Sequence, residues 1–342
     1  MISKIIAEDL INKVYSSLQD AEKIAIVVHV NPDGDAMGAA LGLWHYLMTI
    51  EKEPTVISPT AYPNFLSWMP GANEVLIYEN DKEKADNVLA SAELIFTLDF
   101  NSLHRLEEMA EAVASSPAPK ILVDHHLHPE SFAKITISYP EISSTSEMIF
   151  RLICRMGDFA NINLACAECI YTGMMTDTGS FTYNSNDPEI YIIISELIKI
   201  GIDKDEIYRK VFNTYSENRL RLMGFCLYEK MQTFPEFRTA IISLTQEELS
   251  QFNYVNGDAE GFVNIPLSVK GIDFSVFLRE EKNRIKISLR SQGNFPANKV
   301  AADLFGGGGH LNAAGAESYA SMQETIHTLL NALPDYQVFF EE

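Results

Sequence analysis

The stretch that decides the fold is KIAIVVHVNPDGDAMGAALGLW, residues 23–44. It opens with a short apolar run rich in β-branched residues, as expected of a buried strand. A polar loop follows, in which Pro32 and Gly34 favour a tight turn. The rest has helical spacing with small residues near its start. The stretch therefore predicts a strand, a turn and a helix.

The same alternation continues through the first half of the chain. PTVISP, ELIFTLDF and KILVDHH are further strand-like runs, separated by helical segments such as SLHRLEEMAEAVASS. Strands that alternate with helices form mostly parallel sheets covered on both faces. We therefore expect an α/β fold with a mostly parallel sheet.

The character of the sequence changes after about residue 186. Three helical segments come first, and from about residue 237 FRTAIISL, FSVFLRE and RIKISLR alternate as strands do. A glycine run and a last helix follow. We expect an N-terminal catalytic domain over 1–190, a helical linker over 191–232 and a smaller α/β domain over 233–342, with a cleft between the two domains.

Acids and histidines gather where the apolar runs of the first half end. In an open α/β sheet the carboxyl ends of the strands border the crevice that binds ligands. Taken alone, each of these segments also fits a polar loop or a helix cap. His125 and His126 are neighbours, and adjacent side chains on an extended backbone point to opposite faces, so we expect them to have different roles. The residues are His29, Asp33, Asp35, Asp99, Asp124, His125, His126 and Asp177.

Together these side chains predict a metal site. Asp33, Asp35, Asp99 and Asp177 carry a formal charge of −4, which two divalent cations would cancel. Mixed imidazole and carboxylate donors suit a divalent cation and favour the softer ions, but they do not separate Mn²⁺ from Mg²⁺ or Co²⁺. Two-metal sites, with ions about 3.5–4 Å apart, serve phosphoryl chemistry.

The composition limits the class of partner. The chain has 342 residues, 26 basic and 47 acidic, for a formal net charge of −21. That balance argues against a protein that grips long nucleic acid, which requires a basic face. Glu8 and Asp9 interrupt any signal-peptide core, and no apolar run is long enough to span a membrane. We therefore expect a soluble cytoplasmic protein without a membrane partner. We also expect the two cysteines of the C-x-x-C pair, Cys166 and Cys169, to lie in the core.

The four clusters, HVNPDGDAMG, LDF, DHH and MMTDTGSF, resemble the motifs of the DHH phosphoesterase superfamily. SLRS (288–291) and GGGGHLNAAG (306–315) resemble the DHH-associated domain that follows in one branch. The length and these signatures are most similar to the NrnA type, which combines a nanoRNase with a pAp phosphatase. The resemblance covers nearly the whole chain.

The resemblance also implies roles. His29, Asp33 and Asp99 would hold one manganese ion, and Asp35, Asp99, His125 and Asp177 the second, with Asp99 bridging. A bridging water, acidified by both ions, would attack phosphorus. His126 would contact the phosphate oxygens, and Asp124 would orient a histidine or touch metal.

Substrate recognition is expected in the second domain. The resemblance points to Arg290 and His310, with the glycine run leaving room for an anion. Arg105 fits equally a phosphate contact and a solvent-exposed helix residue. The residues expected to contact the substrate are Arg105 in the first domain and, in the second, Arg290, Gly307, Gly308, Gly309 and His310.

The expected function is hydrolysis of short oligonucleotides to mononucleotides and of pAp to AMP. One alternative is a pyrophosphatase or exopolyphosphatase, which needs no aromatic surface such as Phe262 or Tyr254 for a nucleoside. Another is a non-catalytic nucleotide-binding regulator. The direction of degradation, the choice between RNA and DNA, and homodimer formation stay open.

Overall fold

The computed structural model describes residues 4–213 and 215–340 and divides the chain into two compact units, Met1–Thr214 and Tyr215–Glu342. The chain ends and residue 214, which the predicted domains and linker include, lie outside the described residues. Each unit has its own sheet and its own hydrophobic core.

The first unit is built on a six-stranded, fully parallel sheet in the order β3-β2-β1-β4-β5-β6. This confirms the predicted α/β class. The order reverses between β1 and β4, and such a switch point opens the crevice at the carboxyl ends of the strands. The strands are β1 (Lys23–Val27), β2 (Glu53–Ser58), β3 (Leu76–Ile77), β4 (Leu94–Leu98), β5 (Lys120–Asp124) and β6 (Ile135–Ser138).

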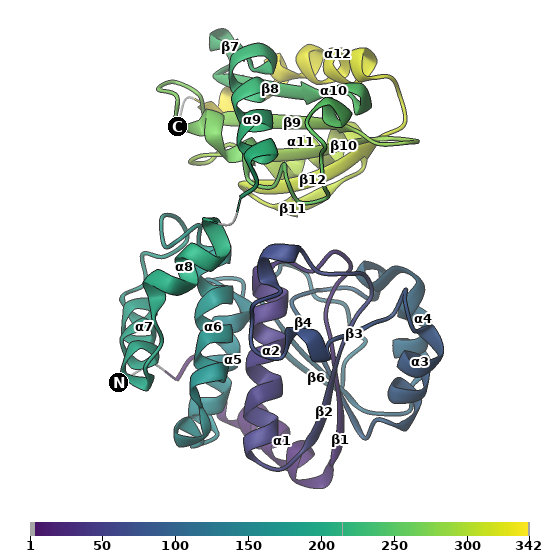
Figure 1. The fold of residues 1–342 in the computed structure, drawn as a ribbon, viewed down its shortest axis with the longest axis vertical. Helices are drawn as coiled ribbons and strands as arrows, with labels where there is room; N and C mark the ends of the chain where they lie inside the picture. The colour runs from purple at the N-terminus through teal and green to yellow at the C-terminus, as the bar shows by residue number, and fades with distance from the viewer. Residues whose placement is uncertain (1–3, 214, 341–342) are drawn as a thin grey trace. The chain divides into compact units, whose positions relative to one another are not determined.

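Helices cover both faces of this sheet (Figure 1). Alternate residues of β1 enter different cores: Ile24 and Ile26 pack with α2, α5 and α6, whereas Ala25 and Val27 pack with α3 and α4. The strands therefore read as continuous apolar runs because both of their faces are buried. The helices are α1 (Glu8–Asp20), α2 (Gly34–Thr49), α3 (Lys82–Ser91), α4 (Ala110–Ser115), α5 (Thr145–Arg155), α6 (Leu164–Asp177), α7 (Pro188–Ile200) and α8 (Lys204–Phe212).

Helices α2 and α6 run antiparallel at very short distance, because glycines face the contact. A Cβ at Gly38 would lie 2.7 Å from the Cα of Gly173 and from the carbonyl oxygen of Cys169. A Cβ at Gly34 would lie 2.3 Å from Thr176 Oγ1. The spacing of Gly34, Gly38 and Gly42 repeats every four residues and so keeps one face of α2 free of side chains. This contact brings the start of α2 to the end of α6.

The second unit contains a mixed six-stranded sheet in the order β11-β12-β10-β9-β8-β7, in which β8 and β9 are parallel and the other pairs antiparallel. Helices α11 and α12 pack on one face, and α9 and the segment Phe262–Ser268 pack on the other. The elements are α9 (Glu217–Phe225), β7 (Gln232–Phe234), β8 (Thr239–Leu244), α10 (Gln246–Gln251), β9 (Phe274–Glu280), β10 (Ile285–Ser291), α11 (Ala297–Phe305), β11 (Gly308–His310), β12 (Ala313–Ser318) and α12 (Met322–Ala332).

The segment 191–232, predicted as a linker, is helical but divides between the units. Ile193, Leu197 and Ile207, on α7 and α8, belong to the core of the first unit, whereas Leu222, on α9, belongs to the second. Their apolar faces are buried within the units, so the break between the units falls at residues 214 and 215.

The positions of two cysteines and the length of the helices were both considered in the sequence analysis. Cys166 and Cys169 are free and fully buried, which confirms that they are core residues. Within the described ranges, no helix combines the length and apolarity needed to cross a membrane.

Candidate metal centre

The site lies at the switch point of the first sheet, where polar residues follow β1, β4 and β5. His29 comes two residues after β1, and Asp99 directly follows β4. Asp124 ends β5 and His125 follows it. Asp99 has φ of 66°, in the left-handed region that residues with a side chain rarely adopt. Such strained positions persist where the surroundings hold them, and they concentrate at functional sites.

Two further acids come from helix ends. Asp33 is the N-cap of α2, and its Oδ1 accepts hydrogen bonds from the backbone N–H of Asp35 and of Ala36, both at 3.0 Å. Asp35 lies in the first turn of the same helix. Asp33 is thus a helix cap and a site residue at once.

Asp177 corrects the sequence interpretation. The apolar run before it was expected to end at the same strand edge as the others, but it is helix α6, and Asp177 is its last residue. The antiparallel packing of α6 against the glycine face of α2 carries Asp177 to the site. The spacing of the glycines on α2 is a signal in the sequence that could have indicated this contact, but it was not used.

The first donor group contains His29, Asp33 and Asp99, which each offer one ligand atom within 4.8 Å of the others. His29 is 4% exposed. Its Nδ1 lies 2.8 Å from the carbonyl oxygen of Val30, so this nitrogen carries the proton and donates. Nε2 then presents its lone pair, and it lies 3.6 Å from Asp99 Oδ2, beyond ordinary hydrogen-bond length. Nε2 has no hydrogen-bond partner among the described residues.

The second donor group surrounds His125. Its Nε2 lies 3.5 Å from Asp99 Oδ1, 3.7 Å from Asp177 Oδ2 and 3.9 Å from Asp35 Oδ2. Its Nδ1 faces the carbonyl oxygen of Ile142 at 3.3 Å. Asp99 therefore approaches the first histidine with one carboxylate oxygen and the second histidine with the other.

The pKa values of the site residues are shifted because several carboxylates are buried close together. Burial, followed by the neighbouring carboxylates of Asp99 and Asp177, raises the pKa of Asp35 well above its usual value. Burial and nearby carboxylates likewise raise the pKa of Asp177 to about 7. Burial lowers the pKa of His125, but Asp177, Asp99 and Asp35 outweigh it and raise the pKa to about 9. The site thus attracts positive charge strongly.

The start of α5 holds two of the carboxylates, a feature that sequence reasoning missed. The backbone N–H groups of Thr145 and Ser146 donate to the two oxygens of Asp35, at 2.6 and 2.8 Å. The Thr145 hydroxyl donates to Asp99 Oδ1 at 2.9 Å. The available signal was the run SSTSE, which predicts a helix start but not what its free N–H groups bind.

His126 belongs to a neighbouring arrangement. Its Nδ1 donates to Asp124 Oδ1 at 2.7 Å, and its Nε2 accepts from Arg105 Nη1 at 3.2 Å. Asp124 therefore orients His126, and Asp124 Oδ2 has no hydrogen-bond partner in the described chain. Arg105 is half-buried in a 3₁₀ segment, Leu103–Met109, and its guanidinium faces this site instead of lying on an exposed helix.

The residues fit a pair of divalent cations. The unpartnered Nε2 of His29 is buried and faces carboxylates, and the tautomer is the one a metal-bound imidazole requires. Four acids converge with two histidines on two donor groups that share Asp99. Nitrogen and oxygen donors in this mixture suit divalent metal ions.

In the second unit, strand register brings two predicted residues together. Ala313 on β12 pairs with Arg290 on β10 and with His310 on β11. Directly paired residues point to the same face of a sheet, so Arg290 and His310 share one row. In the next row Gly315 pairs with Ser288 and with Gly308, and both glycines are exposed. The register therefore places a surface with little side-chain cover beside a cation and an imidazole.

The glycines of the run differ in what they do. A Cβ at Gly307 would lie 2.2 Å from the carbonyl oxygen of Gly315, and one at Gly309 would lie 2.4 Å from that of Ala313. These two are required by the packing of β11 on β12. A Cβ at Gly308 would meet nothing within 4 Å, so Gly308 is the glycine that leaves the surface open.

The aromatic residues considered for nucleoside stacking are both engaged. Phe262 is 1% exposed and packs edge-to-face on Phe277 in the core of the second unit, so it offers no stacking surface. Tyr254 lies under the guanidinium of Arg279, which also donates to its hydroxyl.

The comparisons with known proteins agree with this architecture. The profile described as the DHH family, N-terminal domain, matches residues 23–174, and the profile described as the DHHA1 domain matches residues 239–336. A Thermus thermophilus protein named bifunctional oligoribonuclease and PAP phosphatase NrnA is 30% identical over 295 residues, 86% of this chain and 83% of that protein. The chain belongs to the DHH family.

Two further relatives place this DHH-family phosphoesterase more narrowly. A Bacillus subtilis protein of the same name is 26% identical over 293 residues, 85% of this chain and 88% of that protein. The crystal structure of an exopolyphosphatase-related protein from Bacteroides fragilis is 56% identical, with a TM-score of 0.97 and full coverage of both chains. The fold of the Bacteroides fragilis protein thus matches this chain over its full length, and the sequence of the Bacillus subtilis protein matches most of it.

Proposed function

We propose that this protein is a Mn²⁺-dependent phosphoesterase that hydrolyses short oligonucleotides to mononucleotides and pAp to AMP. The observation that carries the proposal is the pair of donor groups around Asp99, since two adjacent cation sites suit phosphoryl transfer. The names of the relatives from Thermus thermophilus and Bacillus subtilis support this choice of substrates.

The residues of the first unit would bind the metal ions and contact the phosphate. One ion would be held by His29, Asp33 and Asp99, and the other by Asp35, Asp99, His125 and Asp177. Bound divalent ions lower the pKa of a water molecule and offset the charge that develops on a phosphoryl group. The Arg105 guanidinium, which already donates to His126, offers further N–H donors to phosphate oxygens. His126, fixed by Asp124, would contact the same oxygens.

The second unit would capture the end of the substrate. Arg290 supplies a planar fork of N–H donors that matches a phosphate. His310 stands in the same row, and Gly308 allows an anion to approach the backbone. A protein with a net charge of −21 repels a long polyanion, so short substrates are favoured.

Hydrolysis of pyrophosphate or polyphosphate is the second candidate. The description of the Bacteroides fragilis structure as exopolyphosphatase-related favours it, and the same ions would serve that reaction. A nucleotide-binding regulator without turnover is the third candidate.

A turnover panel separates these candidates. Purified protein would receive Mn²⁺ and one of a dinucleotide, a five-mer, a 25-mer, pAp, pyrophosphate or polyphosphate, each with and without chelator. We expect mononucleotides from the short oligomers, AMP from pAp, little product from the 25-mer, and loss of turnover in chelator or in Asp33→Ala. Phosphate from pyrophosphate or polyphosphate alone would support the second candidate. Nucleotide binding without any turnover would support the regulator.

A further inference from the structure

We propose that Thr145 is a positioning residue that sets the carboxylates of Asp35 and Asp99, so that the affinity for Mn²⁺ depends on its hydroxyl. The proposal rests on the proposed function, because it concerns how the ligands of the two ions are held. The Thr145 hydroxyl lies 2.9 Å from Asp99 Oδ1, whereas the nearest ring nitrogens of His125 and His29 lie 3.5 and 3.6 Å from the Asp99 oxygens.

Thr145 touches both donor groups at once. Its backbone N–H donates to Asp35 Oδ2, and its Oγ1 donates to Asp99 Oδ1. Asp35 belongs to the second donor group, and Asp99 is the acid that both groups share. All three residues are at most 2% exposed, so water does not compete for these contacts.

The position of Thr145 in α5 explains why it can do this. The first N–H groups of a helix have no partner within the helix, and the partial positive charge of this end favours a carboxylate. Asp35 takes two of these N–H groups. The hydroxyl adds a third hydrogen bond, to a different carboxylate. Because the terminal torsion of an Asp side chain is soft, this hydrogen bond fixes the direction in which Asp99 presents its remaining lone pairs.

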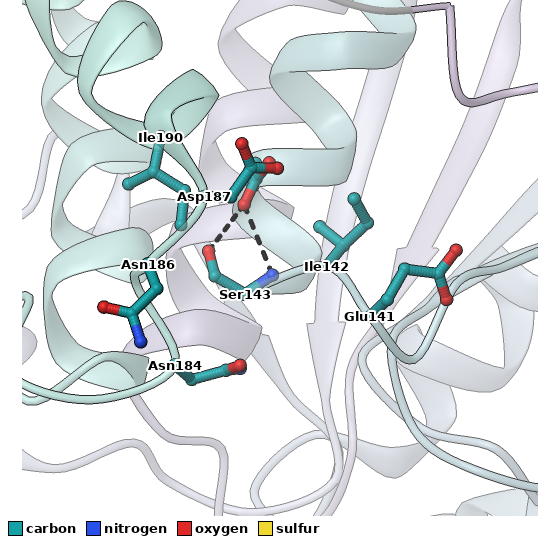
Figure 2. Close-up of a pocket in the computed structure, with 8 residues that line it drawn as sticks. Glu141, Ile142, Ser143, Asn184, Asn186, Asp187 and Ile190 are labelled. Carbon is teal, nitrogen blue, oxygen red and sulfur yellow. Dashed lines mark hydrogen bonds between the residues drawn. The ribbon is translucent and has the colours of Figure 1, made fainter.

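The start of α5 is itself anchored. The Glu147 carboxylate accepts from the backbone N–H and the hydroxyl of Ser143, at 3.3 and 2.6 Å, which Figure 2 draws as dashed lines. Arg151 donates to Glu147 at 2.7 Å and to Glu189 of α7 at 2.8 Å. The carbonyl oxygen of Ile142, one residue before Ser143, faces His125. The loop that leads into α5 is thus held rigidly beside the ligands.

The test compares Mn²⁺ binding in Thr145 variants by titration calorimetry on the full chain. Thr145→Val keeps the shape and the backbone N–H but removes the hydroxyl. Partners behind metal ligands typically contribute 10–100-fold to metal affinity, so we expect Mn²⁺ to bind about 10–100-fold more weakly. Thr145→Ser restores the hydroxyl and should return the affinity toward that of the unchanged protein. A purely structural role for Thr145 would not produce this split between the two variants.

Thr325→Val is the matched control. Thr325 is 1% exposed, lies in the first part of α12 in the second unit, and its hydroxyl donates to the carbonyl oxygen of Ser321 at 2.9 Å. We expect this variant to bind Mn²⁺ as the unchanged protein does, even where its melting temperature falls. If Thr145→Val does not fold, Thr145→Ala, which also removes the hydroxyl and keeps the backbone N–H, gives the same comparison.

The outcomes separate this proposal from the proposed function. An unchanged protein that binds no Mn²⁺ overturns the metal site and with it the role of Thr145. An unchanged protein that binds Mn²⁺, together with a Thr145→Val variant that binds it equally well, overturns only the role of Thr145.

Discussion

Replacing Gly173 by alanine tests whether helix packing sets the position of Asp35. A Cβ at Gly173 would lie 1.9 Å from Ser146 Oγ, 2.7 Å from Ser146 Cβ and 3.0 Å from Asp35 Oδ1. The hydroxyl can rotate away, but the Cβ of Ser146 cannot. The two Cβ atoms must therefore move apart by 0.3 Å to reach 3.0 Å, the shortest distance that real Cβ atoms adopt, and by 0.7 Å to reach ordinary contact at 3.4 Å. Because Ser146 N donates to Asp35, this shift reaches the Asp35 carboxylate directly.

The magnitude follows from two opposing effects. An extra methyl group in a packed core typically costs about 1–3 kcal/mol, whereas alanine is favoured over glycine inside a helix by about 1 kcal/mol. We expect a net destabilisation of about 0–2 kcal/mol, which lowers the melting temperature by at most about 8 °C. Misplacement of a reacting group by about 1 Å costs up to about 100-fold in rate. We therefore expect kcat/KM for pAp to fall about 10–100-fold.

Gly224→Ala is the control for this prediction. Gly224 lies in α9 of the second unit, where an added Cβ meets nothing within 4 Å. This variant should gain about 0.5–1 kcal/mol of stability with unchanged kcat/KM. The assay is pAp hydrolysis at saturating Mn²⁺, with melting temperature measured on the same samples. A Gly173→Ala variant with unchanged kcat/KM and unchanged Mn²⁺ affinity would refute the reasoning.

Three further predictions concern the anchor of α5, the glycine run of the second unit and Arg290. Glu147→Gln leaves a buried guanidinium with a weakened partner, which typically costs about 3–5 kcal/mol, so the melting temperature should fall by about 10 °C in calorimetry; an unchanged value would contradict this. Gly309→Ala should destabilise the second unit by about 1–3 kcal/mol. Gly308→Ala should leave the melting temperature unchanged and raise KM for pAp about tenfold. Equal effects of the two variants would argue against an anion-binding surface at Gly308. Arg290→Gln should raise KM for pAp about 10–100-fold through loss of a charge-assisted hydrogen bond. The control is Arg284→Gln, because Arg284 is half-exposed and pairs with Glu317, and this change should leave KM unchanged. Equal KM values for the two variants would count against the role of Arg290.

Residues at strand ends could be predicted from sequence because the rule is local. A buried strand followed by His29 or Asp99 ends at the sheet edge wherever the strands are parallel, and one apolar run is enough to locate each residue. Arg290 and His310 were named instead from the resemblance, and the row that they share was not predicted, since strand register is not visible in either segment alone.

The contacts missed by sequence reasoning depend on helices that meet far apart in the chain. Asp177 reaches the site because Gly38 allows α2 and α6 to approach closely, and a helix end does not point to a sheet edge by itself. Thr145 was visible only as part of a helix start, since its partners Asp35 and Asp99 lie 110 and 46 residues away. The break between the units falls inside the predicted linker, but its position there was not visible in the sequence, because an amphipathic helix does not indicate which core buries its apolar face.

The proposed function depends on Asp99 bridging two ions at the switch point of the first sheet. The most direct measurement is an anomalous difference map from crystals soaked in Mn²⁺. We expect two peaks about 3.5–4 Å apart, one against Nε2 of His29 and the other against Nε2 of His125, with Asp99 between them. A single peak, or peaks that leave His29 Nε2 without a metal, would contradict the account.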